Sequence, residues 1–448
     1  MKNEGNNLRR NDSIRCTSVR FDGISQTDRD FLRKHRETIL KETDFNKFIE
    51  KVNAVQQELS SLDSFSSVIP VVNTKNENSE VDVTFKVRKS RIKYSVGSTI
   101  NKKGKVGFEI SAFIPNLFGT LSSIRLGLET FGKKSREFSF GLFTPMLLNS
   151  NLNMSYSLFN NTLNDNNTPF SNNYFGSKLR LSDKFGANNL TLESSMRETH
   201  ANLDNGESTC EKHFKETPMK TLKNSISYSW NKNSHSSNEI KNDTKSNTIR
   251  QFNIEYAGFN SDVQFIKIEA FQQWKTMFRR CIEKPAFFNN LHLGLNLGLG
   301  MLLPNFSKGN FGLKTTIHDR FFLGGNNGFH RCLIGFASGS VGPCLKGDVD
   351  ASTTTNSRPK NTYIGGNGYL SGELTLQYPL NMNKYGFNIE PNLMSYINVA
   401  TIVDGHDTIL TGNGSFSDKK EILDNFKRTI RASTGIGKLT RLKECNLE

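Results

Sequence analysis

The chain has 448 residues, 35% of them hydrophobic and 23% charged, with a formal net charge of +15. This charge would suit a nucleic acid or an anionic membrane surface, but the basic residues are scattered and no zinc-ligand spacing accompanies them. We therefore expect a solvated surface and no nucleic-acid partner. The six cysteines form no CxxC pair, which argues against a metal site or a disulfide scaffold. Without an apolar run of about 18 residues or a secretory signal, we expect neither a transmembrane helix nor a cleaved leader.

Residues 14–90 have the pattern of a small independent domain, preceded by a flexible tail at 1–13. Gly23 ends the first strand, and Asp44 opens the second helix, in which apolar residues recur at three- and four-residue steps. The predicted order is β-α-α-β-β, and nothing in this domain suggests catalysis. The predicted elements are a strand within 14–22, helices within 26–41 and 44–62, and strands at 65–73 and 81–89.

From about Arg91 onward, segments of about ten residues alternate between apolar and polar positions. In LHLGLNLGLG, residues 291–300, the leucines point to one side, and His292 and the glycines point to the other. A soluble all-β protein also alternates, but about fourteen such strands favour a barrel whose every second residue meets lipid. We therefore predict a mostly β fold, with a transmembrane antiparallel β-barrel at 91–448 and an aqueous loop in the polar tract 231–248.

Four stretches follow one another late in the chain: IHDRFFLGG from Ile317, GPCLKGD from Gly342, YIGGNGYLSGELTLQYPL from Tyr363 and RTIRASTGIGKL from Arg428. In this order, after a β-α-α-β-β domain, they resemble the outer-membrane protein insertase superfamily. The resemblance is closest to the barrel subunit of the mitochondrial sorting and assembly machinery (SAM). It implies a single polypeptide-transport-associated (POTRA) domain in the N-terminal part, followed by a barrel that has sixteen strands in the family. The single POTRA-like domain and the lack of a secretory signal favour the mitochondrial branch.

The glycine-rich stretch from Asp319 fits neither spacing of a phosphate-binding loop. By resemblance it belongs to a loop at about 305–361 that folds into the barrel lumen and ends in an Arg-Gly-aromatic tip. Cys332 and Leu333 stand where the glycine and the aromatic residue are expected. We expect Arg331 to pair with the lumen-facing Glu373, and a solvated arginine is the alternative. The loop motif comprises Asp319, Arg320, Phe321, Phe322, Leu323, Gly324, Gly325 and Arg331.

The C-terminal stretch GIGKLTRLKECNLE does not fit the terminal insertion signal that the resemblance leads us to expect. With Gly435 as the signal glycine, Lys438 takes an apolar position, and with Gly437 Thr440 does so. We therefore expect this chain to be one to two strands short of the family plan. The first strand would then keep an exposed edge.

The resemblance implies folding and insertion of β-barrel precursors into the mitochondrial outer membrane, with the POTRA-like domain in the intermembrane space. A precursor's terminal strand would pair with the first barrel strand through main-chain hydrogen bonds. The implied partners are β-barrel precursors, peripheral metaxin-like SAM subunits, intermembrane-space chaperones and the lipid bilayer. We expect no enzyme activity, catalytic residue, metal or cofactor, and the alternative function is a passive pore or a protein-translocation channel. The expected client-pairing residues are Ile92, Tyr94, Val96, Thr99 and Ile100.

Overall fold

A computed structural model shows how the chain folds, and it divides into two compact units. One comprises Met1–Asn161 with Ser177–Lys184, and the other comprises Thr162–Gly176 with Phe185–Glu448. The predicted tail at 1–13 lies outside the described residues. The structure describes residues 14–24, 29–75, 80–100, 106–117, 119, 121–131, 135–145, 151–164, 170–201, 220–236, 245–278, 291–304, 315–324, 333, 336, 340–342, 344–345, 362–363, 365–379, 389–403 and 430–442.

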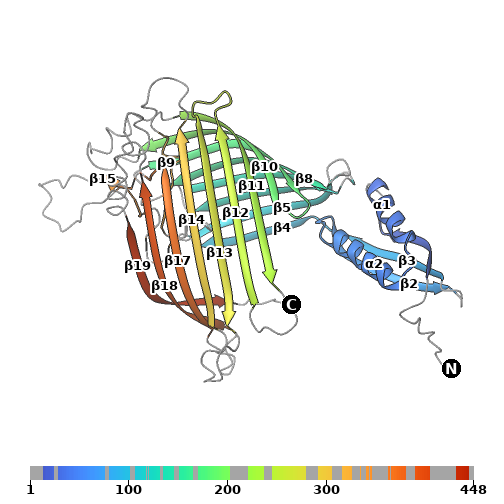
Figure 1. Ribbon diagram of the computed structural model, residues 1–448. Helices are drawn as coiled ribbons and strands as arrows, with labels where there is room; N and C mark the ends of the chain where they lie inside the picture. The colour runs from blue at the N-terminus through green and yellow to red at the C-terminus, as the bar shows by residue number, and fades with distance from the viewer. Residues whose placement is uncertain are drawn as a thin grey trace, which may run out of the picture. The chain divides into compact units, whose positions relative to one another are not determined.

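The N-terminal domain has the predicted element order β-α-α-β-β and is drawn in blue in Figure 1. Its three strands form one sheet in the order β1-β3-β2, with β1 parallel and β2 antiparallel to β3. Asp44 caps the second helix, because its side chain accepts hydrogen bonds from the backbone N–H groups of Asn46 and Lys47. Neither helix in the described part of the chain is long and apolar enough to cross a membrane. The elements are β1 (Arg15–Asp22), α1 (Arg29–Leu40), α2 (Phe45–Ser60), β2 (Phe65–Lys75) and β3 (Glu80–Lys89).

Fourteen strands form a second sheet, in the order β19-β18-β17-β14-β13-β12-β11-β10-β9-β8-β7-β6-β5-β4. This number agrees with the strand count expected from the sequence. Each neighbouring pair with a described register is antiparallel. The strands are β4 (Lys93–Ile100), β5 (Val106–Leu117), β6 (Ser122–Phe131), β7 (Ser135–Thr144), β8 (Leu152–Asn164), β9 (Phe170–Asp183), β10 (Asn188–Ala201), β11 (Lys220–Ser236), β12 (Lys245–Ala257), β13 (Phe265–Phe278), β14 (Leu291–Pro304), β17 (Gly368–Pro379), β18 (Ile389–Val403) and β19 (Arg431–Leu442).

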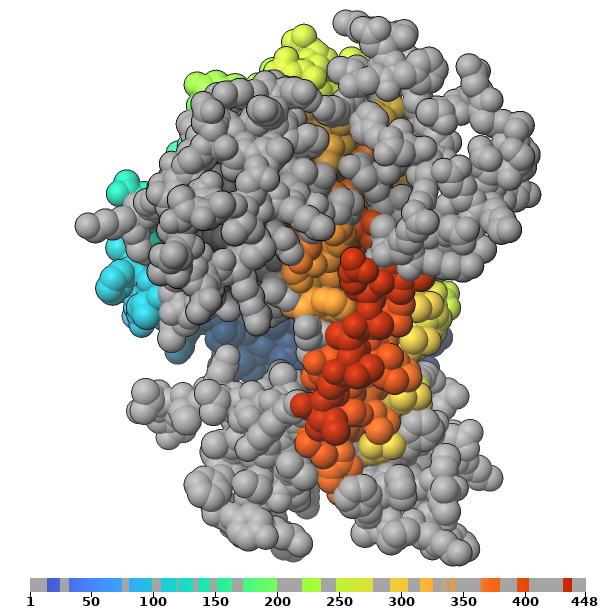
Figure 2. Space-filling model, turned by 90° about the vertical axis from the view of Figure 1, so that its left-hand side faces the viewer, coloured from blue at the N-terminus to red at the C-terminus, as the bar shows by residue number. Residues whose placement is uncertain are grey.

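The order of this sheet ends at β4 on one side and at β19 on the other. Figures 1 and 2 show β19 in red beside β18. Each of the two end strands is hydrogen-bonded to one neighbouring strand in the described part of the chain. The predicted closure of the sheet into a barrel is therefore not seen among these residues.

Several strands of the large sheet, among them β10, β11 and β14, bury mainly polar residues and glycines and expose apolar residues, which is the reverse of the usual arrangement in water-soluble proteins. In β14, Leu295, Leu297 and Leu299 are exposed, whereas Gly298 and Gly300 are buried. We call the buried side the inner face and the exposed side the outer face. An apolar outer face is what a sheet needs where its surface meets lipid. In β10 and β11, the exposed set includes Leu190, Leu192, Met196, Leu222 and Tyr228, and the buried set Thr191, Ser195, Arg197, Thr221, Lys223 and Ser225.

The prediction of an aqueous loop at 231–248 was wrong in its extent. Strands β11 and β12 reach into this tract and pair as far as Ser236 opposite Ser246. The backbone hydrogen bonds of a hairpin do not depend on side-chain polarity, so polar residues on both faces allow strands to continue beyond the apolar zone.

Packing in the N-terminal unit continues past the boundary placed at residue 90. Leu121, from the turn between β5 and β6, is buried in the hydrophobic core of the N-terminal domain. Its carbonyl oxygen accepts a hydrogen bond from Ser64 Oγ (3.1 Å), and Arg125 Nη2 lies 2.6 Å from Asp63 Oδ2. Leu121 has a φ of 60°, which is a strained value for a leucine. This turn therefore contributes to the domain core, although the sequence pattern changes about thirty residues earlier.

Candidate functional site

The site is formed where a loop segment lies against the inner face of the large sheet. This segment, Thr315–Gly324, follows β14 in the chain, and we call it the loop seat. Its backbone is tied down by two hydrogen bonds between Phe321 and Gly366, Phe321 N to Gly366 O (2.8 Å) and Gly366 N to Phe321 O (3.0 Å). A third bond runs from Val341 N to Leu323 O (3.3 Å). The two-residue strands β15 (Cys344–Leu345) and β16 (Thr362–Tyr363) pair with each other in the same connection.

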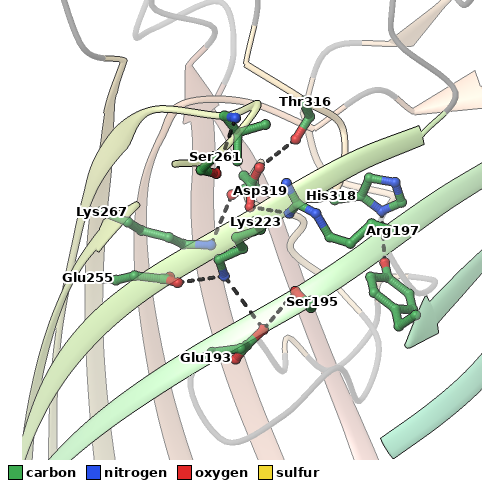
Figure 3. Close-up of polar contacts among 12 residues, drawn as sticks. Glu193, Ser195, Arg197, Lys223, Glu255, Ser261, Lys267, Thr316, His318 and Asp319 are labelled. Atoms are coloured by element: carbon green, nitrogen blue, oxygen red, sulfur yellow. Dashed lines mark hydrogen bonds and ion pairs between the residues drawn. The ribbon is translucent and has the colours of Figure 1, made fainter. Parts of the chain in front are cut away.

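Asp319 is held by two cations of the strand wall (Figure 3). Arg197 Nη1 on β10 lies 2.6 Å from Asp319 Oδ1, and both side chains are buried. Lys267 Nζ on β13 donates to the Asp319 carbonyl oxygen at 2.9 Å, and Thr316 Oγ1 donates to Asp319 Oδ2. Burial alone would raise the pKa of Asp319, but the charge and hydrogen bond of Arg197 outweigh it and lower the pKa. Asp319 therefore carries its negative charge inside the protein.

A second row of charges crosses β10, β11 and β12 beside this pair (Figure 3). Lys223 Nζ lies 2.5 Å from Glu255 Oε1 and 3.9 Å from Glu193 Oε1. Ser195 Oγ donates to Glu193 Oε1 at 3.3 Å. Burying a charge is costly unless partners compensate it, and here each cation has an anion or a carbonyl oxygen. The network thus joins three strands to one another without leaving Lys223 uncompensated.

His318 lies between two hydroxyl groups of the wall. Its Nδ1 is 3.0 Å from Tyr174 OH on β9, and its Nε2 is 2.6 Å from Thr199 Oγ1 on β10. Burial lowers the pKa of His318 to about 4, and the positive charge of Arg197 acts in the same direction. The ring is therefore neutral near pH 7. A neutral imidazole has one donor and one acceptor nitrogen, which matches a hydroxyl group on each side.

The apolar side of the loop seat is formed around Phe321. Its ring lies edge-on to Tyr369, with ring centroids 4.8 Å apart, and Lys267 Nζ lies 4.6 Å from its centroid. A Cβ on Gly300 would come within 2.2 Å of the Tyr369 ring and 2.9 Å of the Phe321 ring, so the wall needs a glycine there. The buried apolar cluster comprises Ala257, Val263, Phe265, Leu302, Phe321, Leu323, Leu333, Val341, Tyr369, Ala400 and Ile402.

The structure brings together most of the predicted loop motif. Asp319, Arg320, Phe321 and Leu323 are buried, and Phe322 is half-buried. The backbone of Gly324 has a φ of 107°, which favours glycine. Arg320 Nε donates to the carbonyl oxygen (3.3 Å) and to Oγ1 (3.1 Å) of Thr315, so this arginine stabilises the loop seat itself. Gly325 and Arg331 lie outside the described residues.

The other predicted residues lie apart from the loop seat. Glu373 Oε1 on β17 accepts a hydrogen bond from Asn296 Nδ2 (3.1 Å), and Asn296 Oδ1 accepts one from Gln273 Nε2 (2.7 Å). The pairing of Glu373 with Arg331 stays a prediction.

The expected client-pairing residues lie in and beside β4. Tyr94 and Val96 are 75% and 78% exposed and point to the same face of this strand. Ile92 precedes the strand, and Thr99 and Ile100 lie at its end, where their side chains are outside the described set.

Reasoning from the sequence missed the wall residues Arg197, Lys223 and Lys267, and it quoted His318 within the stretch from Ile317 without giving it a role. The signal of the three wall residues was weak, because single charged residues at inner-face positions of alternating strands look like any polar lining residue. Among the described residues, no group of three or more His, Cys, Asp and Glu side chains could hold a metal ion.

Comparison with known proteins identifies the family of the chain. The Omp85 superfamily domain matches residues 116–438. The crystal structure of BamA from Haemophilus ducreyi lacking POTRA domains 1–3 is similar with a TM-score of 0.63 and 17% identity, over 96% of this chain and 82% of that chain. CdiB from Acinetobacter baumannii gives a TM-score of 0.47 and 10% identity, over 96% of this chain and 68% of that chain. Comparison with curated protein sequences finds no match. The chain belongs to the Omp85 superfamily.

Proposed function

We propose that this protein folds and inserts β-barrel precursors into an outer membrane by adding their strands to the end of its own sheet. One observation carries the proposal. The fourteen-stranded sheet ends at β4, which pairs with β5 on one side and exposes Tyr94 and Val96. Within the described part of the chain, β4 is hydrogen-bonded to β5 alone, and an edge strand of this kind can template an incoming strand through main-chain hydrogen bonds, with little demand on side chains. The process needs no covalent chemistry, so we propose that the protein is not an enzyme.

The loop seat supports this proposal, because its contacts connect several strands in the middle of the sheet to one segment. Asp319 and His318 connect the loop to β9, β10 and β13, and Phe321 packs against Tyr369 of β17. We expect movement to be easiest at the two ends of the sheet, where β4 and β19 each have one paired neighbour among the residues that the structure describes. A passive pore has no need for a buried polar network that occupies its inner face, and this observation favours the insertase over the pore.

The mitochondrial outer membrane is the location that we propose, with the N-terminal domain as a POTRA domain in the intermembrane space. The proposal rests on the stretches from Ile317 to Leu380 and on the element order of residues 15–89. Its partners would be β-barrel precursors, metaxin-like peripheral subunits and intermembrane-space chaperones.

A protease-protection assay tests the location of the N-terminal domain. A tag ahead of β1 should resist protease added to intact mitochondria and be cleaved after the outer membrane is opened.

Depletion of the protein tests the function. Assembly of a newly imported β-barrel precursor into the outer membrane, followed on native gels, should fall, while import of a matrix protein should continue at its normal initial rate. Normal barrel assembly after depletion would contradict the insertase function and leave the translocation channel as the remaining proposal.

A direct test of strand pairing places a cysteine at Val96 and another in the precursor's last strand. A disulfide between them should form during assembly, and a cysteine at Phe185, in the turn after β9, should not give one.

A further inference from the structure

The outer face of the β11–β12 hairpin changes in character along its length. Three cross-strand pairs of apolar or aromatic residues are followed by a basic pair and then by small polar pairs. Successive pairs on one face are about 7 Å apart, so the change from apolar to charged takes place within one step. From the apolar end, the pairs are Ile226–Tyr256, Tyr228–Ile254, Trp230–Phe252, Lys232–Arg250, Ser234–Thr248 and Ser236–Ser246.

The basic pair, Lys232 and Arg250, is unusual because like charges directly opposite each other destabilise a sheet. Both residues are exposed, and they stand in register on neighbouring strands. On the same face, the residue opposite Arg250 on the next strand is the neutral Gln272. On the other side, β10 begins at Asn188 opposite Trp230, so its described register places no residue opposite Lys232. By register, no carboxylate of the described strands is placed to compensate this pair.

We propose that Lys232 and Arg250 form a binding site for the headgroup of an anionic phospholipid. Two cations side by side match the charge of a phosphate, which would remove their mutual repulsion. The position favours a lipid over a free anion, because the apolar pairs above the site continue as a surface for acyl chains. Trp230, one step above the basic pair, is the residue type that lies at the level of lipid headgroups. The site requires only that the outer face meets lipid, and it is independent of the insertase proposal.

The two tryptophans of the chain make the site measurable. Trp230 belongs to the apolar pair next to the basic pair, and Trp274 lies opposite Thr248, one step beyond Arg250 on the outer face. The full-length protein is reconstituted in phosphatidylcholine vesicles with about 20% phosphatidylglycerol. Either the neutral or the anionic lipid carries brominated chains, which quench nearby tryptophan fluorescence. Brominated phosphatidylglycerol should quench more per molecule than brominated phosphatidylcholine.

The double variant Lys232→Gln/Arg250→Gln should lose this preference. Each basic residue near a membrane surface contributes about fivefold to binding of anionic lipid, so the pair should contribute about 10- to 30-fold. The matched control, Lys86→Gln/Arg88→Gln, removes the same charge from exposed positions of β3 and should keep the preference. Equal quenching by both lipids in the unaltered protein, or an unchanged preference in the double variant, would overturn the proposal. Loss of the preference on adding millimolar inorganic phosphate at constant ionic strength would also overturn it, since the site would then bind free anions.

Discussion

At the scale of single residues, the pair of Arg197 and Asp319 decides where the loop seat lies. Both side chains are buried, and their charged atoms are 2.6 Å apart. A buried pair of this kind adds little net stability, because desolvation offsets the attraction, but removing one partner leaves a buried charge uncompensated. We therefore expect the pair to favour the observed position of the loop seat, because moving the loop away would leave Arg197 or Asp319 buried alone.

Replacing Arg197 should release the loop seat. We expect Arg197→Met to cost about 3–5 kcal/mol, because Asp319 keeps its charge without its closest cation. Adding Asp319→Asn should recover part of this loss. The measurement is the free energy of unfolding in lipid vesicles, together with protease cleavage between β14 and β17. Lys220→Met is the control, since the exposed Lys220 lies 3.1 Å from the half-buried Glu198 on the same hairpin, and its replacement should change stability by less than about 1 kcal/mol. Equal effects of the two single substitutions would contradict the anchoring role.

His35 should make the N-terminal domain less stable in acid. Burial lowers its pKa below the usual 6.5, with Lys184 and Lys34 acting in the same direction, although Glu58 raises it. Below about pH 6.5 the unfolded state binds a proton that the folded state does not bind, so stability falls as the pH decreases. His35→Gln cannot take up this proton and should show a weaker pH dependence. Native-state hydrogen exchange of α1 and α2 in the full-length protein, at about pH 7.5 and about pH 5.5, measures the difference. An identical pH dependence in both proteins would exclude His35 as its source.

At the scale of elements, local sequence patterns predicted most of the helices and strands, but they predicted few of the contacts between distant parts of the chain. The alternation of leucine and glycine in LHLGLNLGLG predicted β14 and its two faces, because a strand's side chains alternate by geometry. Asp44 predicted the start of α2, because capping is a local interaction. The contact between Arg197 and Asp319 spans 122 residues, and no local rule selects one lining arginine among many. The extent of β11 and β12 was missed, since their polar ends carry no apolar period.

A side chain at Gly300 should destabilise the contact between β14 and the loop seat. A Cβ there would lie 2.2 Å from the Tyr369 ring, and Phe321 is also too close, so an aromatic side chain must move. We expect Gly300→Ala to cost about 1–3 kcal/mol and to expose the loop seat to protease. Gly372→Ala on β17 is the matched control, because the nearest atom to its Cβ would be 3.7 Å away. Similar thermal unfolding of the two variants would mean that the rings repack without cost.

At the scale of the whole molecule, the two faces of the sheet explain its unusual composition. Only 35% of the residues are hydrophobic, because the inner face is polar and only alternate strand residues need to be apolar. The amino-acid composition therefore resembles that of a water-soluble protein, and only the alternation of apolar and polar residues along the strands differs. Alternation in about fourteen segments predicted this arrangement. The pairing order of the strands and the position of the loop seat depend on contacts between residues far apart in the chain, which local patterns do not encode.

The reversed faces predict opposite responses to a charge at two neighbouring residues. Leu297, near the middle of β14, faces outward and is 44% exposed, and Asn296 faces inward beside Glu373. Leu297→Arg should cost about 2–4 kcal/mol in lipid vesicles, because a lipid-facing cation at mid-depth has neither water nor a partner. Asn296→Arg should cost less than about 1 kcal/mol, since the new cation can pair with Glu373 in a polar environment. Reversible unfolding by denaturant in vesicles gives both values. A water-soluble sheet buries its apolar side, so the opposite order of the two costs would show that the outer face of β14 does not meet lipid.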